Sequence, residues 1–172
     1  MATGRGTKLT GAVGEFLVAA ELCRRGLIAT PFSGNVPHYD IVASDEYGGH
    51  LVIQVKAMNK STWQFDASKF IKIAMDGDTQ VLGDYAGDPY PNLYCVFVAL
   101  GDTYKKDRYF VFSWKQLQAI VIDHHRTYLK KHGGIRPKAP KSTHCSISIQ
   151  GLKHFEDEWF SIEDAMTKTR YV

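Results

Sequence analysis

The sequence lacks the features of a secreted or membrane-embedded protein. Its three cysteines, Cys23, Cys95 and Cys145, are widely spaced and odd in number among 172 residues. Such a set forms neither a disulfide framework nor a zinc-ligand spacing, so we expect reduced, buried thiols in a cytoplasmic protein. No apolar run approaches the length of a membrane span. Glu15 and Glu21 interrupt the apolar stretch near the N-terminus, which argues against a signal peptide.

An excess of charge of one sign is also absent. The 21 Lys and Arg residues nearly balance the 18 Asp and Glu residues, which gives a formal net charge of +3 and a pI near 8.7. This mild basicity is compatible with binding to nucleic acid but does not by itself indicate it. The length and the 44% hydrophobic content predict one domain over 1–172, with a core over about 8–132 and a C-terminal elaboration over about 133–172.

Two short apolar runs, 38–43 and 51–56, flank a polar segment with two glycines and therefore predict a β-hairpin. Side chains alternate faces along a strand, so Gln54 and Lys56 share one face. A turn centred between the runs places Asp40 directly across from Gln54. We therefore expect a carboxylate, an amide oxygen and an ammonium group on one face of a small sheet.

These groups match the ligand preferences of Mg²⁺, which takes hard oxygen donors and keeps several waters. Asp40 offers a charged oxygen, Gln54 an amide oxygen and Val55 a backbone carbonyl. Lys56 is suited to orient or deprotonate a water, or to neutralise charge on a phosphate in the transition state. The alternative is a surface hairpin whose outer face is merely polar.

A second acid, Glu15, lies on a predicted amphipathic helix over 10–25. Gly26 follows as a C-terminal stop. Placed early on this helix, Glu15 is expected to reach the metal or its waters. The helical repeat predicts that the buried side comprises Val13, Phe16, Leu17 and Ala20.

The order of these elements resembles the PD-(D/E)XK nuclease superfamily, in particular its Holliday-junction-resolvase-like and restriction-endonuclease-like members. The matching residues cover about the first third of the chain: Gly14-Glu15, Arg25-Gly26, Tyr39-Asp40-Ile41-Val42 and Ile53-Gln54-Val55-Lys56. The resemblance implies an α/β fold with a restriction-endonuclease-like core, a central mixed β-sheet flanked by helices. It also implies a Mg²⁺ or Mn²⁺ site. Glu15 would assist metal binding, Asp40 would be the metal aspartate, and Lys56 would be the motif lysine.

Two residues depart from the family pattern. Tyr39 stands where the family has proline, and Gln54 stands where it has a second acid. The amide removes one negative charge, which favours a single metal ion and makes Glu15 more important. A Gln-x-Lys version occurs among Mrr-like restriction enzymes. The resemblance therefore implies a Mg²⁺-dependent endodeoxyribonuclease, with an inactive module that binds nucleic acid or a protein partner as the alternative. It also implies a possible homodimer.

The stretch over 126–141 carries six basic residues and no acid: Arg126, Lys130, Lys131, Arg136, Lys138 and Lys141. Its glycines and prolines indicate a flexible or extended loop suited to phosphate contacts, although a solubilising surface loop is the alternative. Lys60 and Lys69 lie near the hairpin in sequence and are further candidates. Four histidines invite a zinc interpretation, but their spacing fits no common zinc pattern: His124, His125, His132 and His144.

The remaining elements follow from periodicity and turn residues. They are a strand over 61–65, a helix over 66–75, a loop over 83–92, strands over 93–100 and 108–112, a helix over 114–131, a strand over 145–149 and a helix over 162–167.

Overall fold

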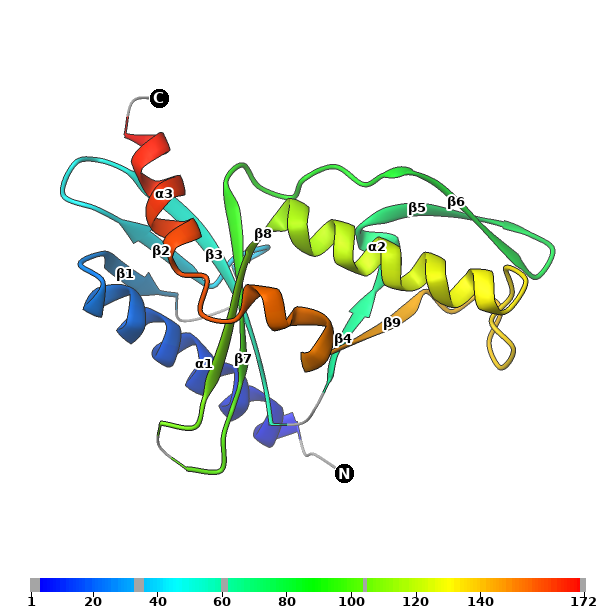
Figure 1. Ribbon diagram of the computed structural model, residues 1–172, viewed down its shortest axis with the longest axis horizontal. Coiled ribbons are helices and arrows are strands. Elements are labelled where there is room, and N and C mark those ends of the chain that lie inside the picture. The colour runs from blue at the N-terminus through cyan, green and yellow to red at the C-terminus, as the bar shows by residue number, and fades with distance from the viewer. Residues whose placement is uncertain (1–3, 33–35, 60–61, 104, 171–172) are drawn as a thin grey trace. The chain divides into compact units, whose positions relative to one another are not determined.

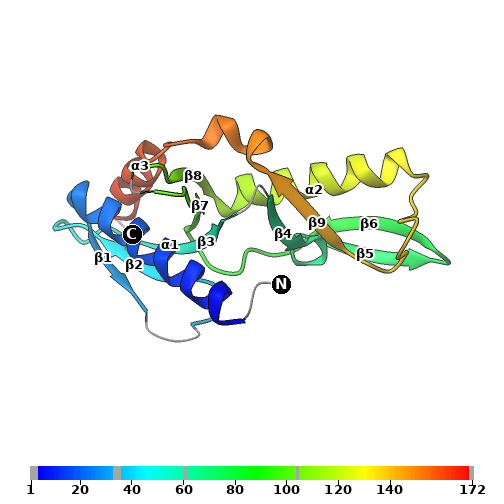
Figure 2. The same ribbon diagram turned by 90° about the horizontal axis from the view of Figure 1, so that it is seen from below.

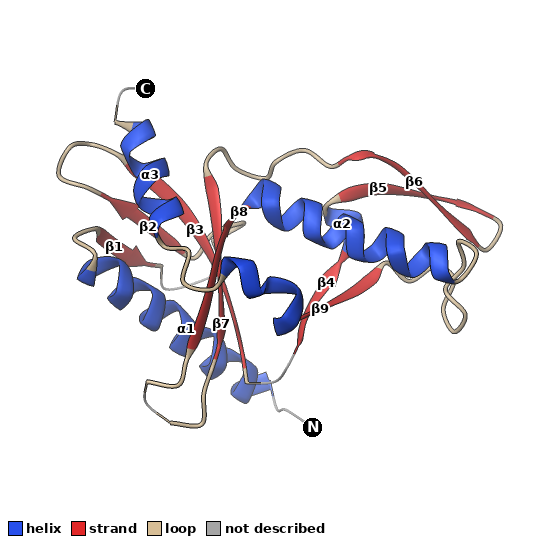
Figure 3. Cartoon of the chain, in the orientation of Figure 1, coloured by secondary structure: helices blue, strands red, loops and turns tan. Residues whose placement is uncertain are grey.

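The computed structural model describes residues 4–32, 36–59, 62–103 and 105–170 (Figures 1 and 3). The elements, with η marking 3-10 helices, are α1 (Gly4–Arg24), β1 (Ile28–Pro31), β2 (Ile41–Ser44), β3 (His50–Met58), β4 (Thr62–Asp66), η1 (Ala67–Lys69), β5 (Ile71–Asp76), β6 (Thr79–Tyr85), β7 (Leu93–Ala99), β8 (Arg108–Ser113), α2 (Trp114–Lys131), β9 (His144–Ser148), η2 (Ile149–Phe155) and α3 (Phe160–Thr169). No helix in these ranges is long and apolar enough to cross a membrane.

The chain divides into two compact units. Unit 1 comprises 1–61, 89–114 and 149–172, and unit 2 comprises 62–88 and 115–148. These boundaries differ from the division into a core and a C-terminal elaboration that the sequence indicated. The single nuclease-like domain over 1–172 stays a prediction.

Unit 1 is built on a five-stranded mixed sheet in the order β1-β2-β3-β7-β8 (Figure 1). Strands β3 and β7 run parallel, and the other neighbouring pairs are antiparallel. The most apolar run of the sequence forms β7 near the middle of this sheet, as its composition predicted. The predicted α/β class with a central mixed sheet is confirmed.

One face of this sheet packs against α1 and α3 (Figure 2). The two helices also meet each other, because the Arg25 guanidinium, just past the end of α1, contacts the α3 carboxylate of Glu163 at 3.1 Å and lies 5.2 Å from the Trp159 ring. The resulting core includes residues from both helices and from four strands: Val18, Leu22, Ile41, Ala43, Leu51, Ile53, Val96, Val98, Val111, Trp159, Ile162 and Met166.

The buried side of α1 differs from the predicted one. Val13 and Phe16 are 45% and 67% exposed, whereas Val18 and Leu22 are fully buried. Apolar residues occur all around this helix, so the helical repeat did not single out one face. The helix also begins earlier than predicted, at Gly4, and it leaves Cys23 exposed, against the expectation of a buried thiol. Gly26 ends the helix as expected, with a φ of +84°.

Gly14 fixes how closely α1 approaches β3. A Cβ at this position would lie 2.5 Å from the Ala57 Cβ and 3.4 Å from the Val55 Cγ1. Such a separation is far below van der Waals contact, so only glycine fits at the present helix-to-strand distance. Because Glu15 follows directly, this contact also sets where its carboxyl group stands.

We expect Gly14→Ala to lower the free energy of unfolding by up to about 2 kcal/mol, because overpacking costs about 1–3 kcal/mol and the gain in helix propensity offsets about 1 kcal/mol. Gly11→Ala on the same helix is the matched control, since its Cβ would meet only the Glu15 Oε1 at 4.0 Å. That variant should be neutral or stabilising. Urea unfolding of both variants measures the difference, and equal effects would contradict the close-packing argument.

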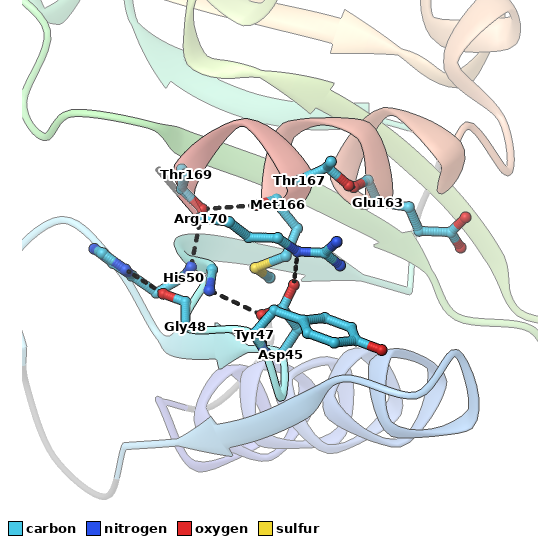
Figure 4. Close-up of polar contacts among 10 residues, drawn as sticks. Asp45, Tyr47, Gly48, His50, Glu163, Met166, Thr167, Thr169 and Arg170 are labelled. Atoms are coloured by element: carbon cyan, nitrogen blue, oxygen red, sulfur yellow. Dashed lines mark hydrogen bonds and ion pairs between the residues drawn. The ribbon is translucent and has the colours of Figure 1, made fainter. Parts of the chain in front are cut away.

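The turn between β2 and β3 is held by the C-terminal end of α3 (Figure 4). Asp45 Oδ1 accepts hydrogen bonds from the backbone N–H groups of Tyr47 and Gly49, and Asp45 Oδ2 accepts one from Arg170 at 2.6 Å. The His50 N–H donates to the Thr169 hydroxyl at 2.9 Å. Contacts on both sides of the turn stabilise the observed register of the hairpin.

Unit 2 consists of α2 after its first residue and two separate two-stranded ribbons, β4–β9 and β5–β6. The predicted helix over 66–75 is wrong, since this stretch forms η1 and then β5. The predicted loop over 83–92 begins inside β6. The strand predicted over 61–65 exists as β4, but it pairs with β9 rather than extending the central sheet. The helix over 114–131 is confirmed.

Candidate functional site

Asp40 lies in a bend directly before β2, so its predicted position opposite Gln54 falls outside the regular pairing of the hairpin. The last regular pair is Ile41 with Ile53, and Asp40 lies one step beyond it. At this point the Asp40 N–H donates to the Ile53 carbonyl at 2.9 Å, and the Asp40 Oδ2 accepts from the Val55 N–H at 2.7 Å. A side-chain oxygen therefore takes the position that a strand carbonyl would otherwise fill. This bond holds the carboxylate at the end of β2.

Gln54 and Lys56 lie on the same face of β3 as the sequence alternation predicted. Both are half-buried. In β7 their parallel neighbours are Cys95 and Phe97, which are buried. Gln54 and Lys56 therefore each lie beside a buried side chain of β7. They mark the border between the apolar part of this face and solvent.

Electrostatic effects connect these side chains. Burial raises the pKa of Asp40, while the hydrogen bond from Val55 and the positive charge of Lys56 act in the opposite direction without cancelling the rise. The pKa of Glu15 is raised too, first by burial and then by the negative charge of Asp40. The two carboxyl groups therefore lie close enough to repel each other, and an added cation would relieve that repulsion.

The oxygens that the sequence predicted as metal donors are those of the Asp40 and Glu15 carboxylates, the Gln54 amide and the Val55 carbonyl. That carbonyl points toward the same edge of β3 as the Val55 N–H, because both groups of a strand residue face the same neighbouring strand. Across the described residues, no cluster of three or more His, Cys, Asp and Glu side chains is placed to hold a metal ion. With two carboxylates and neutral oxygens, the donor set fits one hard cation that retains waters.

The cysteine beside the site has no nucleophilic character. Burial strongly raises the pKa of the Cys95 thiol, and the nearby charge of Asp40 adds to the rise. The thiolate is the reactive form of cysteine, so this thiol stays neutral and serves packing.

An aromatic cluster next to Asp40 was not identified from the sequence. The ring of Tyr39 lies 5.7 Å from that of Phe32 and 5.2 Å from that of Tyr90, in edge-on contacts. Phe32 and Tyr90 remain 37% and 42% exposed. Exposed aromatic faces are platforms on which nucleobases stack. The available signal was Tyr39 itself, an aromatic residue directly before the candidate metal aspartate.

The basic candidates belong to unit 2, except Lys60, which lies outside the described residues. Arg126, Lys130 and Lys131 occupy the last turns of α2, and Arg136, Lys138 and Lys141 follow in the connection to β9. All six are exposed apart from the half-buried Arg136, and Lys69 in η1 is exposed as well. Arg136 stacks 5.1 Å from the Tyr128 ring and donates to the His144 carbonyl.

The four histidines do not form a zinc site among the described residues. His125 is buried and bonded through Nε2 to the Gln80 Oε1 at 2.9 Å. His124 Nδ1 contacts the Cys145 Sγ at 3.4 Å, and the ring of His132 packs 4.6 Å from that of Tyr128. These contacts are those of side chains used in packing and hydrogen bonding.

No protein-family model matches the chain, and no curated protein matches it either. Among solved structures, the chain is similar to a bacterial homing endonuclease, I-Ssp6803I, with a TM-score of 0.55 and 14% sequence identity. The similarity covers 96% of this chain and 99% of that chain. At this level of identity the likeness concerns the fold alone. The mixed α/β architecture described above is thus similar to the fold of that endonuclease.

Proposed function

We propose that the chain is a metal-dependent nuclease of the PD-(D/E)XK superfamily, which hydrolyses phosphodiester bonds in DNA. The observation that carries the proposal is the hydrogen bond that holds the Asp40 carboxylate against Val55, the residue between Gln54 and Lys56 on β3. The charge of Lys56 lowers the pKa of Asp40, and the charge of Asp40 raises that of Glu15, so these groups act on one another. An anionic site beside a lysine, on an endonuclease fold, fits hydrolysis of a phosphate ester better than binding alone.

The residues that would hold Mg²⁺ or Mn²⁺ are Asp40 and Glu15 as charged donors, with Gln54 and the Val55 carbonyl as neutral donors. When bound, such an ion polarises the phosphate and lowers the pKa of a coordinated water. Asp40 is already oriented by its 2.7 Å bond to the Val55 N–H, so little side-chain freedom would be lost on binding.

Lys56 supplies the positive charge of the site. Its ammonium lowers the pKa of Asp40 and thereby keeps that carboxylate available as a ligand. In the reaction it would orient the attacking water, or stabilise the charge that develops on the phosphate oxygens. The burial of Cys95 and Phe97 beside it limits the access of bulk water from that side, which strengthens electrostatic interactions.

The direct test uses purified protein with supercoiled plasmid, single-stranded DNA and branched DNA, each in the presence of Mg²⁺ and of Mn²⁺. We expect cleavage of at least one substrate that stops when EDTA removes the metal. Absence of cleavage on all three substrates with both metals would reject the nuclease proposal.

Gln54 favours a second candidate, a nuclease-fold module that has lost catalysis and binds nucleic acid or a protein partner. The amide leaves the site with one negative charge fewer than a three-acid site has. Salt-sensitive DNA binding without turnover would identify a nucleic-acid module. Copurification with a partner and no DNA affinity would identify a protein-binding module.

We expect Gln54→Glu to lower the Mg²⁺ concentration for half-maximal cleavage, roughly tenfold, because a carboxylate adds a charged ligand. The same change adds a third charge next to two carboxyl groups with raised pKa values, so the metal-free variant should melt at a lower temperature than the parent. Gln150→Glu, on the exposed side of η2, is the control for added charge. If the parent is inactive and Gln54→Glu cleaves, the second candidate describes the natural protein.

The exposed lysines and arginines of unit 2 are proposed to contact DNA phosphates, which gives affinity without sequence preference. Homodimerisation stays a prediction. The exposed apolar side chains of α1, Val13 and Phe16, are the first positions at which to test it.

A further inference from the structure

Unit 2 contains a ribbon with one apolar face and one polar face. In β4–β9, Trp63, Cys145 and Ile147 are at most 4% exposed and form the packed face. The alternate positions pair across the ribbon as Thr62 with Ser148, Gln64 with Ser146 and Asp66 with His144. Every member of this second face is a polar side chain that is exposed or half-buried. Exposure to solvent is by itself enough to explain why this face is polar. A functional role therefore has to be argued from its hydrogen bonds and from the charges around it.

The polar face is ordered by its own hydrogen bonds. The Gln64 Nε2 donates to the Thr62 Oγ1 at 3.0 Å and reaches the Ser146 Oγ at 3.3 Å. At one end, Asp66 Oδ1 accepts from the Ser68 hydroxyl at 2.7 Å and from the Thr143 hydroxyl at 2.6 Å. These contacts hold short side chains in place, so a ligand that exchanges hydrogen bonds with them finds a preorganised surface.

The connection that precedes β9, which the sequence predicted to be a flexible or extended loop, is also held in place. The Gln80 Nε2 donates to the carbonyls of Pro140 and Ser142 at 2.6 and 2.9 Å, and its Oε1 accepts from the buried His125. Burial, Arg136 and His124 lower the pKa of His125, so the neutral ring donates through Nε2. The basic side chains on this connection are therefore presented from a fixed backbone beside the ribbon.

Charge favours a polyanion as the occupant of this face. Unit 2 contains nine Lys and Arg residues against six Asp and Glu residues, so it accounts for the whole net charge of +3. Lys141 lines a surface hollow together with Gln64, Asp66 and His144. The second ribbon, β5–β6, provides the contrast within the same unit, since Asp76 and Asp84 outnumber its single Lys72.

We propose that the β4–β9 ribbon lies in the major groove of duplex DNA and reads base edges with Gln64 and Ser146 at its centre, while Lys138 and Lys141 contact the flanking phosphates. This inference rests on the proposed function and adds to it the recognition of a base sequence. The major groove admits a two-stranded ribbon. Glutamine pairs there with adenine through two hydrogen bonds, and serine pairs with several base edges.

The test selects duplexes from a randomised library with the full chain in Ca²⁺, which keeps the carboxylates liganded. The dissociation constants of the selected duplex and of a scrambled duplex are then compared. We define specificity as the dissociation constant of the scrambled duplex divided by that of the selected duplex. We expect Gln64→Ala, and separately Ser146→Ala, to lower this ratio roughly tenfold, because one good base contact is worth about 1–3 kcal/mol. Affinity for the scrambled duplex should not change. Gln150→Ala is the control outside the ribbon.

Two further variants separate base contacts from phosphate contacts. Gln64→Glu should move the preference at one base pair toward cytosine, whose amino group donates to a carboxylate. Lys138→Ala should weaken binding to both duplexes equally. It should also reduce the slope of log affinity against log salt concentration by about 1. Thermal melting of each variant checks that the ribbon is folded.

The outcomes distinguish the inference from the function on which it rests. If the parent binds no DNA at all, the nuclease proposal and the inference both fail. If it binds DNA but selects no sequence, or if Gln64→Ala and Ser146→Ala keep the parental ratio, the ribbon does not read bases and the nuclease proposal stands.

Discussion

The Asp40→Asn variant is expected to lose DNA cleavage by about a thousandfold or more, because it removes the charged ligand that contributes several kcal/mol to the transition state. Asparagine keeps an oxygen that accepts from the Val55 N–H, so the end of β2 should stay in place. Initial rates on the plasmid substrate in Mg²⁺ measure the loss. Glu46→Gln, in the exposed turn of the same hairpin, removes a charge without touching the site and should cleave like the parent.

The same substitution should make the metal-free protein more stable at neutral pH. The native pKa values of Asp40 and Glu15 are raised, so the native state binds more protons than the unfolded chain between the ordinary and the raised values. The contribution of this pair to the free energy of unfolding therefore falls as pH rises through that window. In Asp40→Asn, the free energy of unfolding should therefore decrease less as pH rises through this window.

Metal binding supplies the complementary measurement. Mg²⁺ should raise the melting temperature of the parent, since an ion that binds only the native state stabilises it, and should leave Asp40→Asn unchanged. Two results would contradict the assignment of Asp40 as a ligand. One is an Asp40→Asn variant that cleaves DNA as fast as the parent, and the other is a parent whose melting temperature changes with neither Mg²⁺ nor Mn²⁺.

The parts of the site that could be predicted from the sequence depend on local rules. Alternation along 51–56 places Gln54 and Lys56 on one face whatever the rest of the chain does. The turn length predicts Asp40 as the partner of Gln54, whereas the regular pairing ends at Ile41 with Ile53 and Asp40 lies in the bend before it. The contact of Asp45 with Arg170 supports the turn of this hairpin. The aromatic neighbours of Asp40 depend on Tyr90, which comes from a distant segment, so no local rule could place them.

The errors in the fold have two physical sources. In 66–75 the apolar residues Phe70, Ile71 and Ala74 have helical spacing, but Ile71 and Ile73 are β-branched and alternate. The two residues that follow Asp76, of which Gly77 has a φ of +57°, close a tight hairpin between β5 and β6. This signal was present in the sequence and was outweighed by the apolar spacing.

The second source of error is pairing between distant segments. Strand β4 was correctly predicted as a strand, but its partner was not, because β9 lies about eighty residues further along the chain. The face of α1 likewise follows from the contact of Gly14 with Ala57 on β3, since apolar residues occur on all sides of the helix. Neither pairing is encoded in the periodicity of one segment.

The Lys56→Ala variant is expected to lower the cleavage rate between about a hundredfold and ten thousandfold, the range that proton transfer or charge stabilisation contributes. The loss should appear in kcat rather than in DNA affinity, because Lys56 acts at the reacting phosphate. It should also raise the pKa of Asp40 further, since the positive charge of Lys56 now lowers it, so the metal dependence should shift to higher pH. Lys153→Ala, an exposed lysine in η2, is the control.

Lys56→Arg separates the two roles of the lysine. Arginine keeps the positive charge but is not deprotonated in proteins, so it cannot act as a general base. If Lys56 stabilises charge, Lys56→Arg should recover much of the rate and keep the parental pH profile. If it takes a proton from water, Lys56→Arg should be as slow as Lys56→Ala, and the rising limb of the pH profile should disappear in both. A rate in Lys56→Ala equal to that of the parent and of Lys153→Ala would remove Lys56 from the site.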